Sequence, residues 1–259
     1  MAKQLEATES KGLEEALQRL PEMEAWVQRL LGRVRPFMDL PPGALVLDLG
    51  AAQGVTVVAF KRAGFESFGV EPFEPAIAVG RQLSERTGVP FETRHGVGEA
   101  LPYEDASFDF VHAYSVMEHV DDPEQVFREV YRVLRPAGGF FFETTSALSP
   151  KQGEIARFPL FPWYPARTQR AIMMWAARER PWLVGGTTRP AIHWFKHRAV
   201  KRSLSAVGFQ SIVDRWTLHA ESGELCGARQ LLVRVASRHQ TIRLIGDIRI
   251  SGLGYLAVK

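Results

Sequence analysis

The spacing of apolar residues along the chain changes at two places, near residues 44 and 145. Before the first, residues 8–34 carry apolar side chains at helical spacing, with Trp26, Leu30 and Val34 on one face. We expect this helix to be broken or restarted at Pro21. Residues 1–40 are therefore predicted to form N-terminal helices that pack on the main domain.

Between residues 44 and 145, short apolar runs alternate with amphipathic segments. The predicted strands are 44–49, 67–70, 91–94, 108–113 and 140–144, and the predicted helices are 54–63, 75–87 and 122–134. Regular β-α alternation is typical of a mostly parallel sheet with helices on both faces. The chain is therefore assigned to the α/β class.

After Thr145 the alternation stops. Residues 146–195 combine prolines, aromatics and arginines, and only 167–178 is expected to be helical within them. A helix over 195–207 and strands near 209–218 and 229–237 are predicted to follow. This places the main domain at 41–240, with an insertion at 146–195 and an extension of unassigned structure at 241–259.

Composition excludes some classes of protein. The 259 residues are 46% hydrophobic and 24% charged, as in ordinary globular domains, and the net charge of +3 is weak support for nucleic-acid binding. Cys226 is the single cysteine, so the chain has no internal disulfide or cysteine metal cluster, and we expect a cytoplasmic location. No stretch approaches the roughly 20 apolar residues of a membrane-spanning helix.

The segment VLDLGAAQG, residues 46–54, carries the clearest chemical signal. An apolar strand enters a turn of small residues that begins a helix, and small residues allow a ligand to approach the backbone closely. Glu71 ends the next strand, where an acid can accept hydrogen bonds from ribose hydroxyls. Neither a complete dinucleotide fingerprint nor a P-loop is present. The pattern favours a nucleoside without a pyrophosphate, and a tight turn without any ligand is the alternative.

Residues 46–54 resemble the first motif of class I S-adenosylmethionine-dependent methyltransferases. Residues 98–109, 117–123 and 127–139 resemble three further motifs, in the order found in the ubiquinone-biosynthesis-like small-molecule and lipid-precursor subfamily, methyltransferase type 11. The resemblance covers about 44–145. It implies a Rossmann-like, doubly wound, seven-stranded sheet, with the 146–195 insertion as a lid after the fifth strand.

The resemblance also implies S-adenosyl-L-methionine as cofactor and a set of residues around it. These are Asp48, Gly50, Ala52, Gly54, Glu71, Pro72, Phe73, Val97, Gly98, Ala113 and Tyr114. Three positions depart from the pattern: Ala52 and Ala137 replace glycines, and Val97 replaces an aspartate that contacts the adenine amino group. Glu99 is one candidate to supply that missing contact.

Methyl transfer requires positioning of the acceptor, and a hydroxyl acceptor also needs a base. His119 is the candidate base, with Glu118 beside it. The competing interpretation is that both residues only tie their loop to the domain. Two such ligands are too few for a metal site.

The stretch 151–202 contains eleven basic residues and only two acidic ones, together with many aromatics. This composition suits a small-molecule acceptor that is aromatic, quinone-like or lipid-linked and bears an acidic group, and it suits peripheral contact with a membrane. Alternatively, the aromatics build a small separate core. A nucleic-acid methyltransferase is disfavoured because no Asn/Asp-Pro-Pro-Tyr/Phe tetrad follows the fourth strand. A non-catalytic cofactor-binding partner protein is the third possibility.

Overall fold

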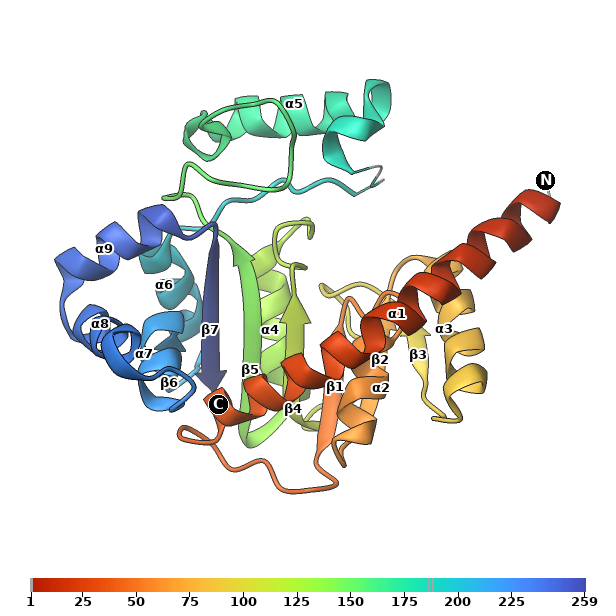
Figure 1. Cartoon of the computed structure of the whole chain (residues 1–259), viewed down its shortest axis with the longest axis horizontal. Helices are drawn as coiled ribbons and strands as arrows, with labels where there is room; N and C mark the ends of the chain where they lie inside the picture. Colours follow the sequence, from red (N-terminus) through yellow and green to blue (C-terminus); the bar gives the residue numbers. More distant parts are fainter. Residues whose placement is uncertain (1, 186, 188) are drawn as a thin grey trace.

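The computed structural model describes residues 2–185, 187 and 189–259; residues 186 and 188 of the predicted insertion lie outside the described residues (Figure 1). The strands are β1 Leu45–Leu49, β2 Glu66–Glu71, β3 Thr93–His95, β4 Phe108–Tyr114, β5 Leu134–Thr145, β6 Ser211–Asp214 and β7 Gly252–Val258. The helices are α1 Ala2–Val34, α2 Val55–Arg62, α3 Glu74–Thr87, α4 Pro123–Val133, η1 Phe161–Trp163, α5 Ala166–Glu179, η2 Pro181–Val184, α6 His197–Val207, α7 Arg215–Glu221, α8 Gly227–Arg238 and α9 Gln240–Arg249.

In the described part of the chain, the strands form one seven-stranded sheet in the order β3-β2-β1-β4-β5-β7-β6. The first five strands pair in parallel, and β7 is antiparallel to both β5 and β6. The predicted α/β class and mostly parallel seven-stranded sheet are confirmed. The carboxyl ends of β1, β2 and β4 meet at one edge, which is where ligands bind in open α/β sheets.

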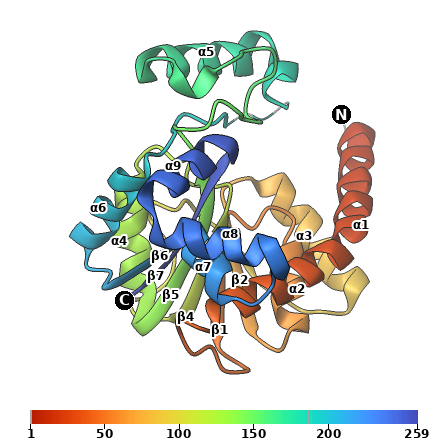
Figure 2. The same ribbon diagram turned by 60° about the vertical axis from the view of Figure 1, so that its left-hand side comes forward.

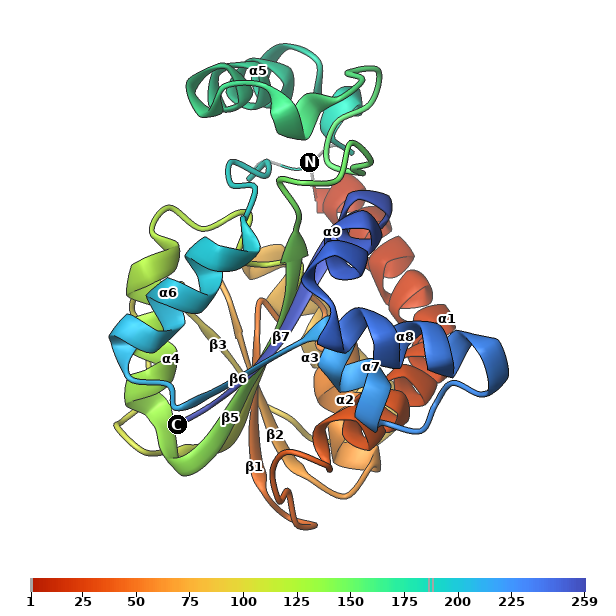
Figure 3. The same cartoon turned by 90° about the vertical axis from the view of Figure 1, so that its left-hand side faces the viewer.

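Alternating side chains of the strands supply a separate core on each face of the sheet. Phe140 and Phe142 pack with α4 and α6, whereas Phe141 between them packs with α1, α2 and α7. This alternation follows from the period of two along a strand. Figure 3 shows α4 and α6 on one side of the sheet and α1, α2 and α7 on the other.

Helix α1 runs unbroken through Pro21, so the predicted break there is wrong. Leu20 precedes the proline and Val27 follows it, and both are buried. The part of α1 before Pro21 packs with α2 and α3, and the part after it packs with α2 and the sheet. This burial outweighs the backbone hydrogen bond that proline cannot donate. In the structure, α1 contacts α2, α3 and α7.

The region after residue 214 differs from the prediction. The expected strand at 229–237 is helix α8, in which Val233 and Ala236 are buried at helical spacing while Leu231 and Leu232 are exposed. The expected strand near 209–218 stops at Asp214, where α7 begins. The boundary at residue 240 is also wrong, because the tail supplies β7 within the sheet.

The described residues of the insertion, 146–185, 187 and 189–195, leave the sheet after β5 and lie above its carboxyl edge (Figure 2). The predicted helix is present as α5. Ile155, Phe161, Met173 and Leu183 are buried in a cluster belonging to the insertion itself. No helix in the described ranges has the length and apolar character needed to cross a membrane.

Candidate cofactor and acceptor site

The turn after β1 needs glycine at position 50. Gly50 has a φ of +76°, and a Cβ on it would lie 2.5 Å from Cγ2 of Val116. The N–H groups of Gly50 and Ala51 donate to the carbonyl of Val70, at 2.9 and 3.0 Å. The turn is therefore joined to the end of β2 with its backbone open towards the carboxyl edge.

Glu71 links this turn to the segment after β2. Its Oε2 accepts the Ala52 N–H at 2.9 Å, and its Oε1 accepts the Phe73 N–H at 2.9 Å. Each carboxylate oxygen has lone pairs beyond these bonds. Glu71 can therefore hold the turn and accept further hydrogen bonds from a ligand.

A cavity of about 400 Å³, here called the β2–β4 cavity, opens beside Glu71. The predicted residues that line it are Gly50, Ala52, Glu71, Pro72, Val97, Gly98, Tyr114 and His119. Thr187 and Arg189 of the insertion close another side. The structure thus gathers most of the predicted cofactor residues around one space.

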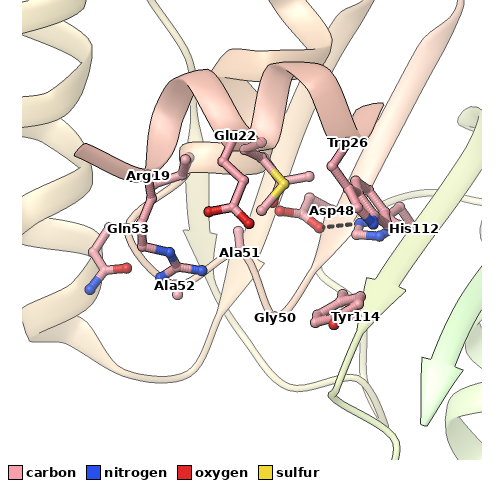
Figure 4. A pocket seen from close by; sticks show the side chains of 13 residues that line it. Arg19, Glu22, Trp26, Asp48, Gly50, Ala51, Ala52, Gln53, His112 and Tyr114 are labelled. Carbon is pink, nitrogen blue, oxygen red and sulfur yellow. Dashed lines mark hydrogen bonds and ion pairs between the residues drawn. The ribbon is translucent and has the colours of Figure 1, made fainter. Parts of the chain in front are cut away.

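A second cavity, of about 340 Å³, lies on the other side of the turn, beneath α1 (Figure 4). In this α1 cavity, Asp48, Gly50, Ala52 and Tyr114 had been predicted as site residues, but Arg19, Glu22, Met23 and Trp26 had not. Those four side chains have the i, i+3, i+4, i+7 spacing of one helix face. In the sequence, this face of the helix is marked by charged residues placed among apolar ones, and that pattern is the signal for a ligand-facing surface.

Asp48 and His112 form a buried pair on the wall of the α1 cavity. Asp48 Oδ1 lies 2.8 Å from His112 Nδ1, and the two residues are 3% and 1% exposed. His112 Nε2 has no hydrogen-bond partner among the described residues. A buried ring nitrogen without a partner is unusual in proteins, and this one lies among the rings of Trp26, Phe60 and Phe141.

A third cavity, of about 160 Å³, is called the β5 cavity. Its lining is almost entirely polar: Tyr114, Ser115, Glu118, Glu143, Thr144, Thr145, Gln152, Gly153, Glu154, Arg215, Ser251 and Gly252. Tyr114 lines all three cavities, because it ends β4 where they meet. Burial raises the pKa of Glu118, whose Oε2 accepts the Thr144 hydroxyl at 2.8 Å.

Glu118 and His119 also hold the last part of the insertion, around residues 189–192. His119 Nδ1 donates to the carbonyl of Arg189 at 2.8 Å, and the Glu118 carbonyl accepts the Ile192 N–H at 2.7 Å. These hydrogen bonds therefore tie the loop that carries Glu118 and His119 to the insertion. The two side chains face different spaces: Glu118 lines the β5 cavity and His119 the β2–β4 cavity.

Three predicted residues line none of these cavities. Gly54 begins α2 at a φ of +77°, and a Cβ there would clash with the Phe91 ring. Ala113 is buried in the core, and Phe73 is exposed at the start of α3. Glu99 lines the β2–β4 cavity, but one of its oxygens accepts the Asp121 N–H at 2.8 Å.

The aromatic side chains of the insertion do not wall the three cavities. Phe158, Phe161, Tyr164 and Trp194 pack in the insertion's own cluster, while Trp163, Trp175 and Trp182 are exposed. The alternative of a small separate core thus accounts for the first group. The insertion reaches the cavities through Gly153 and four polar residues instead, namely Gln152, Glu154, Thr187 and Arg189.

Comparison with known proteins agrees with this arrangement. Residues 47–142 match the family model described as "Methyltransferase domain". The chain is 36% identical over 103 residues to a ubiquinone biosynthesis O-methyltransferase of Pseudomonas entomophila; the match covers 39% of this chain and 44% of that relative. The chain thus matches less than half the length of this relative.

Solved structures share the fold over most of the chain. An S-adenosylmethionine-dependent methyltransferase from Mesorhizobium loti has a TM-score of 0.56 and 19% identity, covering 87% of this chain and 95% of that one. Haemonchus contortus phosphoethanolamine N-methyltransferase 2, solved with phosphomonomethylethanolamine and S-adenosylhomocysteine, has a TM-score of 0.58 and 15% identity, covering 90% and 52%. Residues 47–142 therefore resemble a methyltransferase domain, as their motifs predict, and the solved structures share the fold.

Proposed function

We propose that the protein transfers a methyl group from S-adenosyl-L-methionine to a small-molecule acceptor. The observation that carries the proposal is the placement of the Gly50 turn between two cavities that meet at Tyr114. A nucleoside in one cavity and an amino-acid group in the other would then belong to a single ligand that crosses the turn.

The residues of the β2–β4 cavity fit the nucleoside part. Glu71 has lone pairs left for the two ribose hydroxyls, and Val97 and Gly98 offer a flat apolar edge for adenine. The Val97 side chain cannot accept a hydrogen bond from the adenine amino group. We infer that recognition of adenine depends here on shape and backbone groups.

The residues of the α1 cavity fit the amino-acid part. Arg19 brings a positive charge, and Glu22 and Asp48 bring negative charges. A carboxylate and an ammonium group on one carbon need this combination of partners. Arg19 has no ion-pair partner among the described residues, so its guanidinium is available to a ligand carboxylate.

The polar β5 cavity fits an acceptor that presents hydrogen-bond donors, such as hydroxyl or amine groups. The cavity is lined by three acidic residues, Glu118, Glu143 and Glu154, and by one basic residue. That basic residue, Arg215, lies 3.5 Å from Glu143. The insertion's positive charges therefore do not extend into this space. We infer that the group to be methylated is polar, whether it belongs to a free small molecule or to the head of a lipid-linked one.

Bound S-adenosyl-L-methionine supplies an activated methyl group on a positively charged sulfur. The chain's own task is to hold the acceptor atom in line with that methyl group and to exclude water. Tyr114 occupies the junction through which the acceptor atom must point. Glu118 faces the β5 cavity and is better placed than His119 to receive the acceptor's proton.

Calorimetric titration tests the cofactor assignment. S-adenosylmethionine and S-adenosylhomocysteine should bind, and Arg19→Met should weaken both by about tenfold, the value of one charged hydrogen bond. Methylthioadenosine lacks the amino-acid group, so its affinity should be the same for wild type and Arg19→Met. Arg29→Met, an exposed change on the same helix, is the matched control.

Absence of binding of either cofactor form by the folded wild-type protein would contradict the proposal. Methylation of hydroxyl- and amine-bearing acceptors can be followed by mass spectrometry. A protein that binds the cofactor but methylates none of these acceptors would favour a non-catalytic cofactor-binding protein.

A further inference from the structure

A fourth cavity lies apart from the cofactor site, between the start of α6 and helix α9. It measures about 650 Å³ and is called the α6–α9 cleft. Its lining residues are Leu148, Lys196, His197, Arg198, Lys201, Thr241, Arg243, Leu244 and Asp247. Nothing in the proposed methyl transfer uses this space.

Basic side chains predominate in the cleft. Lys201 and Arg243 both bind the buried Asp214, at 3.3 and 2.8 Å. Lys196 and Arg198 are exposed, and within the described ranges neither has a carboxylate at ion-pair distance. Asp247 is engaged by the Trp216 indole N–H at 2.7 Å. The cleft therefore carries an excess of positive charge that suits an anionic group.

Helix α9 presents apolar side chains to solvent beside this charge. Ile242, Leu244, Ile245 and Ile248 are between 38% and 57% exposed, and Leu244 also lines the cleft. Three of them recur at every third position, so they share one side of the helix. A row of large exposed aliphatic residues next to basic groups is typical of a surface that enters a membrane interface.

The insertion also carries exposed side chains that favour a membrane interface. Its exposed Trp163, Trp175 and Trp182 accompany several arginines, and tryptophan favours the membrane–water interface. Helices α5 and α9 both lie towards the carboxyl edge of the sheet, where the cavities open (Figures 1 and 3). Ser251 and Gly252, which follow α9, line the β5 cavity.

We propose that the α6–α9 cleft binds the phosphate group of an anionic membrane lipid while the exposed side of α9 enters the bilayer. The charge of the cleft matches an anionic lipid surface, and the apolar residues match its acyl region. A second copy of the chain is a poorer occupant, because a two-fold interface would bring the same positive groups together. The surface would place the β5 cavity close to a lipid-linked acceptor.

Sedimentation with vesicles tests this proposal on the full chain without any cofactor. Binding should be strong to vesicles of equal parts phosphatidylcholine and phosphatidylglycerol, weak to phosphatidylcholine alone, and reduced by added salt. Ile245→Ser should lower the partition coefficient on the mixed vesicles by about tenfold. Leu232→Ser on α8 removes a comparably exposed leucine and should change little.

A charge variant tests the cleft separately. Lys196→Gln combined with Arg198→Gln should lower binding to the mixed vesicles by at least about tenfold, since each basic group contributes to attraction by the anionic surface. Arg81→Gln combined with Arg86→Gln makes the same change in charge on the exposed part of α3 and is expected to have no effect.

Three results would overturn the proposal. The first is equal binding of the wild type to the two kinds of vesicle, or none to either. The second is unchanged binding of the α9 and cleft variants. The third is a wild-type dimer in sedimentation velocity that Ile245→Ser converts to a monomer, because α9 would then be an interface between copies. Failure of cofactor binding would leave the vesicle results unaffected.

Discussion

The N–H of Ala52 donates to the carboxylate of Glu71 across 2.9 Å, and Ala52 makes this bond with a φ of +46°. An alanine in the left-handed region is strained because its Cβ crowds the backbone. The turn nevertheless closes, since the charged acceptor on β2 fixes the direction of this N–H. The missing middle glycine of the motif is therefore tolerated at a cost in stability.

We expect Ala52→Gly to stabilise the protein. Relief of left-handed strain is worth about 1–2 kcal/mol, and the added chain entropy of glycine removes about 0.4–1 kcal/mol of it. Urea unfolding should show a net gain of roughly 0.5–1 kcal/mol. Ala51→Gly is the control: its φ is not positive, it is buried against Gly69, and the same change there should destabilise. A less stable Ala52→Gly variant would show that the turn is not strained.

Glu71→Gln should weaken binding of S-adenosylhomocysteine by about tenfold or more, because a charged acceptor is worth about 1.5–3 kcal/mol per bond. The amide also places an NH₂ against one of the two backbone N–H donors, so a small loss of stability should accompany the change. Glu74→Gln, three residues further on and exposed, should leave both quantities unchanged. Undiminished affinity in a folded Glu71→Gln protein would remove Glu71 from the cofactor site.

Val97→Asp should restore an acceptor for the adenine amino group at the edge of the β2–β4 cavity. We expect affinity for S-adenosylhomocysteine to rise severalfold, in line with one hydrogen bond of about 1 kcal/mol. The inosine analogue, which has an oxygen in place of the amino group, should not gain. A large loss of affinity for both compounds, with an unchanged circular dichroism spectrum, would mean that residue 97 does not face adenine.

The sheet from β1 to β5 could be predicted from sequence because each element there has a local signature. Asp122 accepts the N–H groups of Glu124 and Gln125, and Pro123 occupies the first turn, as the Asp-Pro pair indicates. The α1 cavity could not be predicted in this way. Arg19, Asp48 and His112 are far apart in sequence, and only the packing of α1 across the sheet brings them together.

The prediction for the C-terminal region, after residue 214, was wrong for a different reason. Helix α8 buries few residues, so its exposed Leu231 and Leu232 hide the helical period. Strand β7 alternates Leu253 and Tyr255 on one face with Leu256 on the other, which buries both faces and removes the usual contrast between apolar and polar positions. Such a strand cannot be distinguished locally from other short apolar runs.

Asp214 joins β6 to α6, α7 and α9, since it binds Lys201, Arg243 and the Thr217 N–H. Burial opposes its ionisation, but Arg243 and Lys201 outweigh that effect and hold the pKa of Asp214 below its ordinary value. A lowered folded-state pKa stabilises the protein above the unfolded-state value near 3.8, and this stability is lost as the pH falls towards the folded-state pKa.

Asp214→Asn should therefore destabilise the protein at pH 7 by about 3 kcal/mol, because the partner charges lose a buried counter-ion. The difference between variant and wild type should shrink below pH 4. Asp39→Asn, outside any ion pair of the described residues, is the control for removing one carboxylate. Equal stability of wild type and Asp214→Asn across the whole pH range would contradict the role assigned to this carboxylate.

Glu118 gives the last prediction, because its two roles differ in how they depend on pH. Burial raises the pKa of this carboxyl, so it loses its proton at a higher pH than an exposed glutamate. If its carboxylate receives the acceptor's proton, kcat must rise with pH through that raised pKa. Glu118→Gln keeps an oxygen that can accept the Thr144 hydroxyl, and should lower kcat by about 10²–10⁴ while removing the rise.

The stability of the Glu118→Gln variant distinguishes a catalytic role of this side chain from a role in holding the loop. A raised folded-state pKa means that the folded protein holds the proton longer than the unfolded chain, so stability falls as pH increases between the two values. Glu118→Gln should therefore be at least as stable as wild type at pH 7. His119→Gln should keep the pH-dependent rise in kcat, since His119 faces the other cavity. Retention of that rise by Glu118→Gln and its loss in His119→Gln would assign the base to His119 instead.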